Sequence, residues 1–388
     1  MAAAAGGGAA GLLRVAVIGS GPTGALVAAA IAAQLPGARV TVLDKGRLAG
    51  GRMSSARLRD GSGQADHGAQ LIAPGSGVSE PYVAELVGAG VLAPVPADSF
   101  LGARAPLYCL VAPRGTASIV GHYLAQSKAA LVTDARVTSL SRAGAAAGCG
   151  GGATAAAAAW RATTDKGEAG EYDAVVCTIP APQVLQLGGD VPALLAAAGL
   201  DAGLRAVAFS VRFASVAFYA PGSLRQLRQA LPFAGRFLEP AEDDALCYVG
   251  FDSHKRALAG AHDGDSGGGG SGGGSSSSSS PSVVVHSSTA FGAAHAHEDP
   301  TAVGGVLLER LRVLYPGLPP PASVKHHRWL YSQVTLPFPG AAHEPGAVLA
   351  CAAPPLILGG DSFSGSSFEG CVASARAAVA ALRRALGA

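Results

Sequence analysis

The segment from Gly19 to Gly24 constrains the fold of this chain more than any other part of the sequence. It reads GSGPTG, with the spacing G-x-G-x-x-G, and lies between the apolar run RVAVI (14–18) and an alanine-rich stretch over 22–35. In this pattern Gly19 permits a tight turn, Gly21 lets the backbone approach a pyrophosphate, and Gly24 lets helix and strand pack closely. The sequence therefore predicts a strand, a glycine turn and a helix whose N-terminus faces phosphate.

A second predicted strand, ARVTVLD (38–44), ends at Asp44 and is followed by Lys45. An acidic residue about 20 positions after the third glycine accepts hydrogen bonds from an adenosine ribose in dinucleotide-binding folds. Strand, helix and Asp44 occur here in that order, which favours a dinucleotide site over a glycine turn without a ligand. We expect Lys45 to lie beside the same ligand.

Two further segments decide between NAD and FAD. The stretch GGRMSS (50–55) places bare backbone at Gly51 and a guanidinium at Arg52 near the same pyrophosphate, and arginine suits bidentate phosphate contact. Near the far end, PLILGGD (355–361) predicts a buried strand that runs into Asp361, and apolar residues at helical spacing predict a final helix over 370–386. Cofactor elements at both ends of the chain predict FAD, held in an extended form.

Composition limits the remaining possibilities. With 388 residues, 49% of them hydrophobic and 14% charged, the chain has material for about two domains with substantial cores. The net charge is +2 and no basic stripe is interleaved with aromatic residues, so we expect no nucleic-acid partner. Residues 143–159 and 260–281 are Gly-, Ala- or Ser-rich, and we expect both to be disordered loop insertions.

The cysteines predict neither a metal site nor a disulfide framework, because no two of them form a CxxC pair. They are Cys109, Cys149, Cys177, Cys247, Cys351 and Cys371. The N-terminal stretch lacks the early positive charge of a signal peptide, and no segment resembles a membrane span. We therefore expect a cytoplasmic protein without a membrane partner. An organelle transit peptide stays open, because no acidic residue precedes Asp44.

Several further segments resemble the flavin amine oxidase superfamily and, within it, the renalases. They are ADHGAQLIA (65–73), YCLVAPRGTASIVGHYLAQ (108–126), CTIPAPQVLQLGGDV (177–191), VVVHSSTAFG (283–292), HRWLYSQVT (327–335) and LGGDSFSGSSFEGCVASA (358–375). The two glycine motifs identify only the superfamily, whereas SQVT and GGDSFSGSSFEGC are more specific.

The resemblance implies an α/β fold of the glutathione-reductase-like class with non-covalently bound FAD. Its FAD-binding Rossmann domain would comprise 11–79, 105–190 and 322–388. A second, α+β substrate domain with a mixed sheet would comprise 80–104 and 191–321. The resemblance also implies oxidation of aberrant dihydronicotinamide dinucleotides, which are reduced at position 2 or 6 of the ring. A hydride would pass to flavin N5, and the products would be NAD(P)⁺ and, with molecular oxygen, hydrogen peroxide.

The resemblance also implies roles for individual residues. It places Tyr219, His286 and Trp329 around the nicotinamide ring, although ordinary packing stays open for each of them. It places five more residues at the cofactor, beside the flavin, the adenine or a phosphate: Thr23, Gln70, Leu71, Val137 and Phe368.

Two other functions stay open at this point. One is a flavin amine oxidase acting on a small amine, and the other is a non-catalytic protein that keeps FAD and binds a partner. Amine oxidases often hold a lysine near flavin N5, and Lys325 is the nearest candidate in the sequence. His67 stands where the superfamily pattern suggests an apolar residue.

Overall fold

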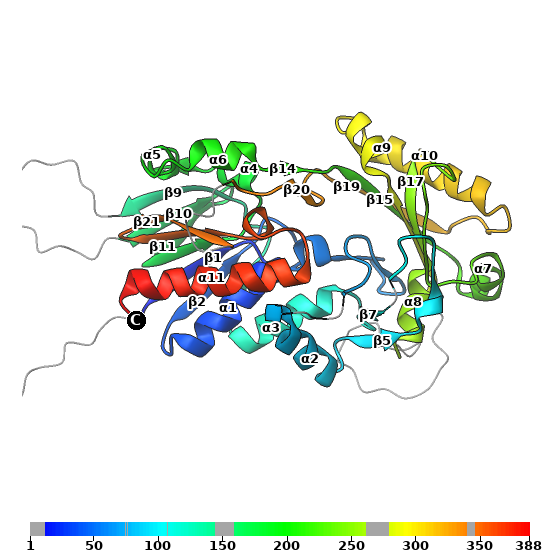
Figure 1. Cartoon of the computed structure of the whole chain (residues 1–388), viewed down its shortest axis with the longest axis horizontal. Helices are drawn as coiled ribbons and strands as arrows, with labels where there is room; N and C mark the ends of the chain where they lie inside the picture. The colour runs from blue at the N-terminus through cyan, green and yellow to red at the C-terminus, as the bar shows by residue number, and fades with distance from the viewer. Residues whose placement is uncertain are drawn as a thin grey trace, which may run out of the picture.

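The computed structural model describes residues 12–73, 75, 77–106, 108–143, 159–260, 279–339 and 346–388, which form two lobes (Figure 1). Most of each low-complexity segment, 144–158 and 261–278, lies outside these residues, so the expectation of disorder there falls outside the described chain. Extended strands run along the top of the view from the first lobe on the left to the second lobe on the right (Figure 1).

The first lobe is built on a six-stranded sheet in which five strands are parallel and the edge strand β21 is antiparallel. In spatial order the strands are β21 (Ala347–Ala352), β22 (Pro355–Gly359), β12 (Ala174–Cys177), β1 (Arg14–Ile18), β2 (Arg39–Leu43) and β8 (Ala130–Val132). Strands β1, β2 and β22 match the strands expected from the sequence. Their continuous apolar runs suit a parallel sheet that is covered on both faces.

Helices cover one face of this sheet. They are α1 (Pro22–Gln34), α2 (Glu80–Gly88), α3 (Ala117–Ser127) and α11 (Phe368–Leu386). The long helix α11 runs beside α1 (Figure 1), and both contribute to one apolar core with the buried strand residues Val15, Val17 and Ile357. The predicted helices over 22–35 and 370–386 are therefore confirmed, with α11 beginning two residues earlier.

A second, four-stranded sheet and three short helices cover the other face. The strands are β11 (Gly167–Tyr172), β10 (Ala159–Thr164), β9 (Val137–Ala143) and β13 (Gly188–Gly189), and the helices are α4 (Ala181–Val184), α5 (Val191–Ala197) and α6 (Asp201–Ala206). Strands β9 and β10, which flank the first low-complexity stretch, pair antiparallel. Trp160 is fully buried here, and its indole N–H donates to the Pro355 carbonyl at 3.0 Å.

The second lobe contains the other six-stranded sheet. In spatial order its strands are β19 (Ser323–Trp329), β15 (Arg212–Phe218), β18 (Ser282–Ser287), β17 (Leu246–Gly250), β16 (Gly235–Phe237) and β6 (Phe100–Leu101). All its pairs are antiparallel except that of β16 with β6, so the sheet is mixed, as expected.

The two faces of this sheet have different neighbours. Side chains alternate along each strand, and Phe213, Ala217 and Val285 point into a core shared with helix residues Leu227 and Leu307. The helices of this lobe are α7 (Leu224–Ala230), α8 (Asp252–Leu258), α9 (Thr289–Ala294) and α10 (Pro300–Leu314). The opposite face turns toward the hairpin β3 (Ser55–Arg57) and β4 (Gln64–Asp66), which belongs to the first half of the chain.

The lobes depart from the expected domain boundaries in three places. Helix α2 lies within 80–104, yet Val83 and Leu86 join the core of the first sheet. Helices α5 and α6 lie within 191–321, yet Leu195 and Leu204 also pack in the first lobe. Strand β19 lies within 322–388 but forms the edge of the second-lobe sheet. Burial of each apolar face, rather than sequence continuity, decides which lobe these elements join.

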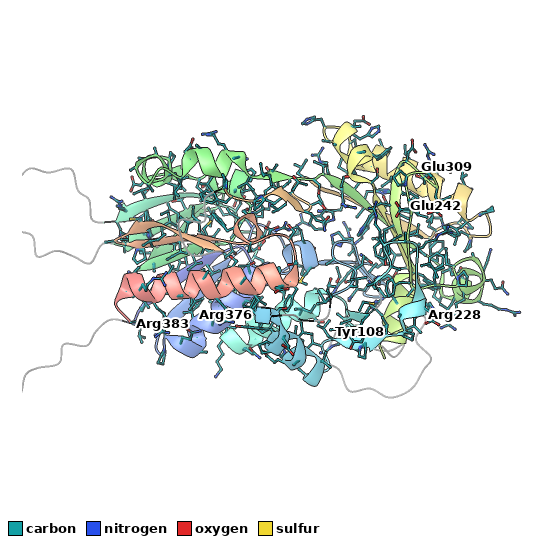
Figure 2. All side chains as sticks on the ribbon, viewed as in Figure 1. Tyr108, Arg228, Glu242, Glu309, Arg376 and Arg383 are labelled. Atoms are coloured by element: carbon teal, nitrogen blue, oxygen red, sulfur yellow. The ribbon has the colours of Figure 1, made fainter. Side chains whose placement is uncertain are left out.

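Two small antiparallel pairs complete the fold: β5 (Ala93–Val95) with β7 (Cys109–Val111), and β14 (Ala208–Phe209) with β20 (Val334–Leu336). Charged side chains such as Arg376 and Arg383 of α11 and Glu309 of α10 lie at the outer surface (Figure 2). Among the helices of the described segments, none is long and apolar enough to cross a membrane.

Candidate functional site

A cavity of about 760 Å³ lies at the carboxyl ends of the parallel strands in the first lobe. Ligands of open α/β sheets bind at this edge. Several lining residues directly follow a strand: Gly19 after β1, Asp44 after β2 and Thr178 after β12. The wall also includes Val137 at the start of β9 and the segment 327–331, which ends β19 and continues beyond it.

The glycines of the first motif lie as their spacing predicts. Gly19 has φ +102°, a value that favours glycine. A Cβ on Gly24 would stand 1.9 Å from the Gly19 carbonyl oxygen, so this position allows close contact between turn and helix. A Cβ on Gly21 would meet no protein atom within 4 Å, and Gly21 lines the cavity. Gly21 therefore leaves room for a ligand and not for packing.

The second glycine motif touches the first. Gly51 has φ +52°, and a Cβ there would stand 3.2 Å from the Gly21 Cα. The Gly50 amide donates to the Ser20 carbonyl at 3.0 Å. Two stretches of bare backbone therefore meet at one wall of the cavity, next to the N-terminus of α1. Backbone amides and a helix N-terminus suit the negative charge of a pyrophosphate.

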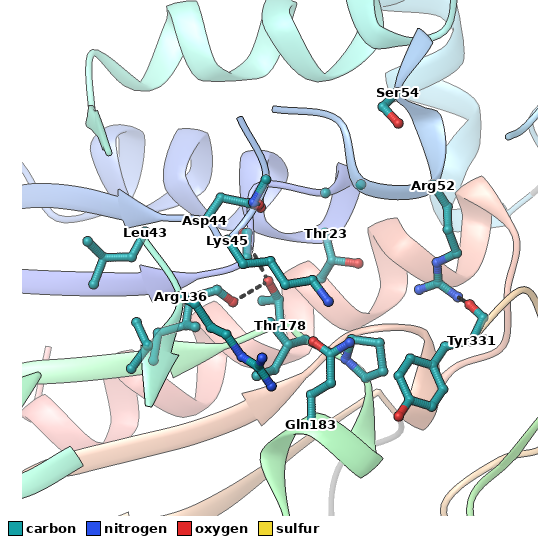
Figure 3. A pocket seen from close by; sticks show the side chains of 18 of the residues that line it. Thr23, Leu43, Asp44, Lys45, Arg52, Ser54, Arg136, Thr178, Gln183 and Tyr331 are labelled. Atoms are coloured by element: carbon teal, nitrogen blue, oxygen red, sulfur yellow. Dashed lines mark hydrogen bonds between the residues drawn. The ribbon is translucent and has the colours of Figure 1, made fainter. Parts of the chain in front are cut away.

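Asp44 lies at the opposite end of the cavity from Arg52 (Figure 3). Its carboxylate accepts hydrogen bonds from the Ser20 amide, the Ser20 hydroxyl and the Gly46 amide, each at 2.6 Å. An ionised carboxylate offers about four acceptor positions. Asp44 therefore stabilises the glycine turn and keeps acceptor capacity for a ribose hydroxyl.

Two cations, Lys45 and Arg136, lie at the Asp44 end of the cavity (Figure 3). Burial lowers the pKa of Lys45, the neighbouring Arg136 lowers it further, and Asp44 opposes both effects. Arg136 donates to the Gln186 side-chain oxygen at 3.3 Å. These cations make this end of the cavity suited to an anionic dinucleotide.

Arg52 and Asp361, both expected at the cofactor, also contact each other. Arg52 Nη1 lies 2.5 Å from Asp361 Oδ2, and Nη2 lies 2.6 Å from Oδ1. The Ser366 hydroxyl donates to the same carboxylate. Both side chains line the cavity, so the ion pair forms part of its wall and joins the second glycine motif to the turn before α11.

The first turn of α11 reaches the same wall. Its N-cap is Ser367, whose hydroxyl accepts from the Gly370 amide at 2.9 Å, and Cys371 lines the cavity beside Thr23 of α1. Phe368, expected at the flavin, instead packs against the core of the first lobe. Two helix N-termini therefore border the cavity, which favours bound negative charge.

Trp329 lines the cavity and forms an aromatic wall with two histidines. The His67 ring stacks on Trp329 with centroids 5.2 Å apart and an interplanar angle of 26°, and the His327 ring lies 3.9 Å from Trp329. The Trp329 indole N–H donates to the His67 carbonyl at 3.0 Å. The loop after β4 and strand β19 thus fix each other's position at the edge of the cavity.

His286 lies next to this wall without lining the cavity. Its strand register places it on the sheet face that carries His327, because both residues stand opposite Ala214. Burial lowers the pKa of His286 and of His67 to about 3, and that of His327 to about 4. All three rings are therefore neutral at pH 7.

Tyr219 does not reach the site, which corrects the expectation that it lines the ring pocket. It follows β15 on the opposite face of the sheet and is buried with Phe213, Leu227 and Leu231 in the core of the second lobe. Burial raises the pKa of its hydroxyl to about 12. Alternation along the strand explains the difference, because Tyr219 shares its parity with Phe213 and not with Ala214.

Gln70 and Leu71 lie behind the wall and do not line the cavity. Leu71 packs against a small core that includes Val95 and Cys109. The Gln70 side chain donates to the Asp66 carbonyl at 2.6 Å and accepts from the Lys255 ammonium at 3.1 Å. These contacts hold the loop that carries His67, and they correct the expectation that Gln70 and Leu71 themselves lie at the cavity.

Lys255 is a fully buried cation that the sequence did not reveal. Its ammonium lies 2.9 Å from Asp252 Oδ1 and 3.4 Å from Asp66 Oδ2, and all three side chains have 0% exposure. Burial alone would raise the pKa of Asp252, but Lys255 and Arg256 hold it below its usual value. An Asp and a Lys three residues apart are also common on exposed helices, so the sequence held no signal of this buried cluster.

Lys325, the lysine considered for a place near the flavin, does not line the cavity. It lies on β19, the edge strand of the second-lobe sheet, and its ammonium donates to the Arg57 carbonyl. It is absent from the residues that line the cavity. The structure therefore gives this lysine a structural contact between β19 and β3.

These residues fit FAD. An extended dinucleotide would be accommodated by the open space at Gly21 and by the adjacent backbones of the two glycine motifs. Its negative charge would be stabilised by the two helix N-termini and by the cations at both ends of the cavity. Asp44 suits the adenosine ribose, and the cavity continues to the aromatic wall at Trp329, where a flavin ring would find a flat neighbour. Nine of the residues expected at the cofactor line this cavity: Gly19, Gly21, Thr23, Asp44, Lys45, Gly51, Arg52, Val137 and Asp361. Gly24 does not line it but allows the close contact between the glycine turn and α1.

Comparison with known proteins agrees with this geometry. Residues 17–86 match the family of NAD(P)-binding Rossmann-like domains, and residues 95–383 match the flavin containing amine oxidoreductase family. Mouse (Mus musculus) renalase is 30% identical over 305 residues, which cover 78% of this chain and 78% of that protein.

Two solved structures share the fold. One is a protein from Exiguobacterium sp. 255-15 assigned as a protoporphyrinogen oxidase, with a TM-score of 0.63, 14% identity and coverage of 97% of this chain and 99% of the other. The second is cyclohexylamine oxidase from Brevibacterium oxydans IH-35A, with a TM-score of 0.64, 12% identity and coverage of 97% and 100%. At these identities the likeness establishes the fold alone.

The family match covers most of the chain, and the relative and the cavity agree with it. The cofactor is therefore FAD, and the chain is an FAD-dependent oxidoreductase. It belongs to the flavin containing amine oxidoreductase family, as a renalase-like member.

Proposed function

We propose that this chain oxidises dihydronicotinamide dinucleotides reduced at position 2 or 6 of the ring. The products are NAD(P)⁺ and hydrogen peroxide. In the overall reaction the dihydro ring loses a hydride, and molecular oxygen takes up these two electrons with one further proton. The observation that carries the proposal is the 30% identity to renalase along 78% of the chain, together with the segments that resembled the renalases in the sequence.

The aromatic wall supports this substrate. Trp329, His67 and His327 present flat faces where a planar nicotinamide can be oriented. When bound, FAD supplies the hydride acceptor and returns the electrons to oxygen. Hydride transfer requires orientation and exclusion of water more than acid–base catalysis. Burial lowers the pKa values of His67 and His327, so both rings are neutral at pH 7 and neither carries a second proton to donate.

The same wall is a poor site for a small amine cation. The described cavity ends in Trp329 with two neutral histidines, and Arg328 adds positive charge to the lining, whereas the charge of Arg52 is paired with Asp361. Positive charge repels a protonated amine and attracts the phosphates of a dinucleotide. This charge distribution favours the dinucleotide over the amine, which is the second reaction that the family description suggests.

The test is turnover by the purified, FAD-loaded protein in air. Borohydride-reduced NAD⁺, which contains the 2- and 6-dihydro isomers, should yield peroxide and NAD⁺ in equal amounts. Purified 4-dihydro NADH and a panel of primary and secondary amines serve as controls. Peroxide from an amine, with none from the 2- and 6-dihydro isomers, would replace this proposal by amine oxidation. No peroxide from either class would favour a non-catalytic role.

A further inference from the structure

The loop over residues 66–70, which follows β4, lies between a buried charge cluster and the aromatic wall of the cavity. On one side stands the Lys255 ammonium, which is fully buried with two carboxylates and does not line the cavity. On the other side stands Trp329, which does line the cavity and donates its indole N–H to the His67 carbonyl at 3.0 Å. The loop therefore contacts both a cluster behind the cavity and a side chain that faces it.

Gln70 connects this cluster with the backbone of the loop. Its side-chain oxygen accepts from the Lys255 ammonium at 3.1 Å, and its NH₂ group donates to the Asp66 carbonyl at 2.6 Å and to the Gly68 carbonyl at 3.1 Å. An ammonium can only donate and a carbonyl can only accept. The reversed amide would set its NH₂ group against the ammonium and its oxygen against both carbonyls, so Lys255 fixes the direction in which the Gln70 amide faces.

The loop carbonyls are shared between two partners. Those of Asp66 and Gly68 accept from Gln70, whereas the His67 carbonyl between them accepts from Trp329. Each peptide unit is rigid and is joined to the next at one Cα, so the two outer units constrain the unit between them. The hydrogen bonds from the Gln70 amide therefore help to determine where the indole finds its acceptor.

A displacement of the loop would reach the cavity through His67, because both its carbonyl and its ring contact Trp329. The loop also packs closely on the second glycine motif. The Ala69 amide donates to the Arg52 carbonyl at 2.9 Å, and a Cβ on Gly68 would stand 2.0 Å from the same carbonyl oxygen. This contact holds the loop beside the cofactor but leaves the direction of the His67 carbonyl to Gln70.

Water has little access to these contacts. Gln70 has 8% exposure and Lys255 has 0%. A buried carbonyl that loses its donor costs about 1–3 kcal/mol. Without the Gln70 amide, the peptide units after Asp66 and Gly68 would gain by turning toward another donor, and the His67 carbonyl would leave its place below the indole.

Resting on the proposed function, we propose that Gln70 is a positioning residue for hydride transfer. Its amide, oriented by Lys255, holds the His67 carbonyl, and that carbonyl sets the position of the Trp329 ring at the cavity. The effect on the reaction is one of orientation, because a misplacement of about 1 Å caused far from the chemistry can lower a rate by about 100-fold. Gln70 thus acts from behind the aromatic wall and not at the flavin, where the resemblance placed it.

The first test uses no substrate. The sequence has two tryptophans, Trp160 and Trp329, so FAD-loaded protein labelled with fluorotryptophan gives two fluorine resonances, which Trp329→Phe identifies. Gln70→Met should shift or broaden the Trp329 resonance and leave that of Trp160, which is buried in the first lobe, unchanged. Gln70→Glu keeps an acceptor for Lys255 but loses the NH₂ group, so it should act in the same way. A Trp329 resonance that stays in place in both variants overturns the proposal.

The second test separates orientation from folding and from cofactor binding. Turnover of 2- or 6-dihydro NAD by FAD-loaded Gln70→Met should fall by about 10–100-fold in kcat, with an unchanged ratio of flavin to protein. A double-mutant cycle then shows whether the effect passes through the wall. Added to Trp329→Phe, the same change should lower kcat by less than about threefold. Equal losses of kcat in the two backgrounds overturn the proposal.

The matched control is Gln226→Met. Gln226 also donates through its amide to a backbone carbonyl, that of Gly317 at 3.0 Å, but it lies at the exposed surface of α7. The Trp329 resonance should stay in place in this variant, and kcat should stay within about twofold. Wild-type protein that does not oxidise the dihydro isomers contradicts the proposed function, and the fluorine spectra of Gln70→Met then still decide whether Gln70 positions Trp329.

Discussion

Arg52 and Asp361 are 309 positions apart in the sequence and form a bidentate ion pair at the cavity wall. Asp361 has 4% side-chain exposure and Arg52 has 31%, so the carboxylate is the more deeply buried partner. The ion pair connects the second glycine motif, near the start of the chain, with the turn that precedes α11. Both ends of the chain thus build one wall of the FAD site.

Arg52→Met is expected to lower the free energy of unfolding by about 3–5 kcal/mol, because it leaves a buried carboxylate without its cation. The flavin content of the purified protein should fall with it. Urea unfolding and visible absorbance give the two quantities. The double variant Arg52→Met/Asp361→Leu should recover much of the stability but not the flavin. A control, Arg14→Met, removes a more exposed pair with Asp173 and should cost at most about 1 kcal/mol.

The two glycines of the first motif should respond in opposite ways to added side chains. Gly21→Val places atoms in open space, so the protein should fold with an unchanged thermal midpoint when stripped of cofactor and should retain little flavin. Gly24→Ala drives a Cβ against the Gly19 carbonyl, so the fold itself should be lost or strongly destabilised. Circular dichroism and the flavin-to-protein ratio distinguish these results. A fully yellow Gly21→Val protein would place the pyrophosphate elsewhere.

Lys255→Met should destabilise the protein by about 3–5 kcal/mol, because Asp66 and Asp252 would then share a buried site with too little positive charge. The Lys255 ammonium also contacts Gln70, so the loop that carries His67 should loosen. Faster amide exchange at 66–70 would report this loosening. Lys166→Met, at a lysine paired with Asp134 on the surface, is the control and should change neither quantity.

The free energy of unfolding should rise with pH between about 4 and 6.5. In this range the unfolded chain protonates His67, His286 and His327, while burial keeps the pKa of each folded ring at about 3 or 4. The unfolded state then binds more protons, so stability increases as pH rises and is lost on acidification. Each ring contributes about 1.4 kcal/mol per pH unit. Comparing urea unfolding at pH 5 and pH 7.5, His286→Phe should lose about 2 kcal/mol less than wild type. Equal losses would show that His286 is not held neutral.

The sequence predicted the elements whose signals are local. The strand before Gly19, the helix after it, the strand that ends at Asp44 and the final helix follow from short apolar runs and glycine positions. Most cofactor-binding residues that line the cavity were identified for the same reason, since they lie within or directly beside a short motif, whereas Val137 came from the family resemblance alone.

Other features depend on packing between distant segments. Tyr219 was expected at the ring pocket, but alternation alone does not tell which face of a strand meets the first lobe. Lys255 and Asp66 are 189 positions apart and meet only after the lobes assemble.

The most direct measurement is the visible spectrum of the FAD-loaded protein under anaerobic conditions, followed by rapid mixing with purified 2- or 6-dihydro NAD. The account predicts rapid loss of the oxidised flavin band, followed by its return with one equivalent of peroxide when air is admitted. Gly21→Val protein, which should hold little flavin, is the blank. A wild-type flavin band that persists with both isomers, but is lost on mixing with an amine, would contradict the account.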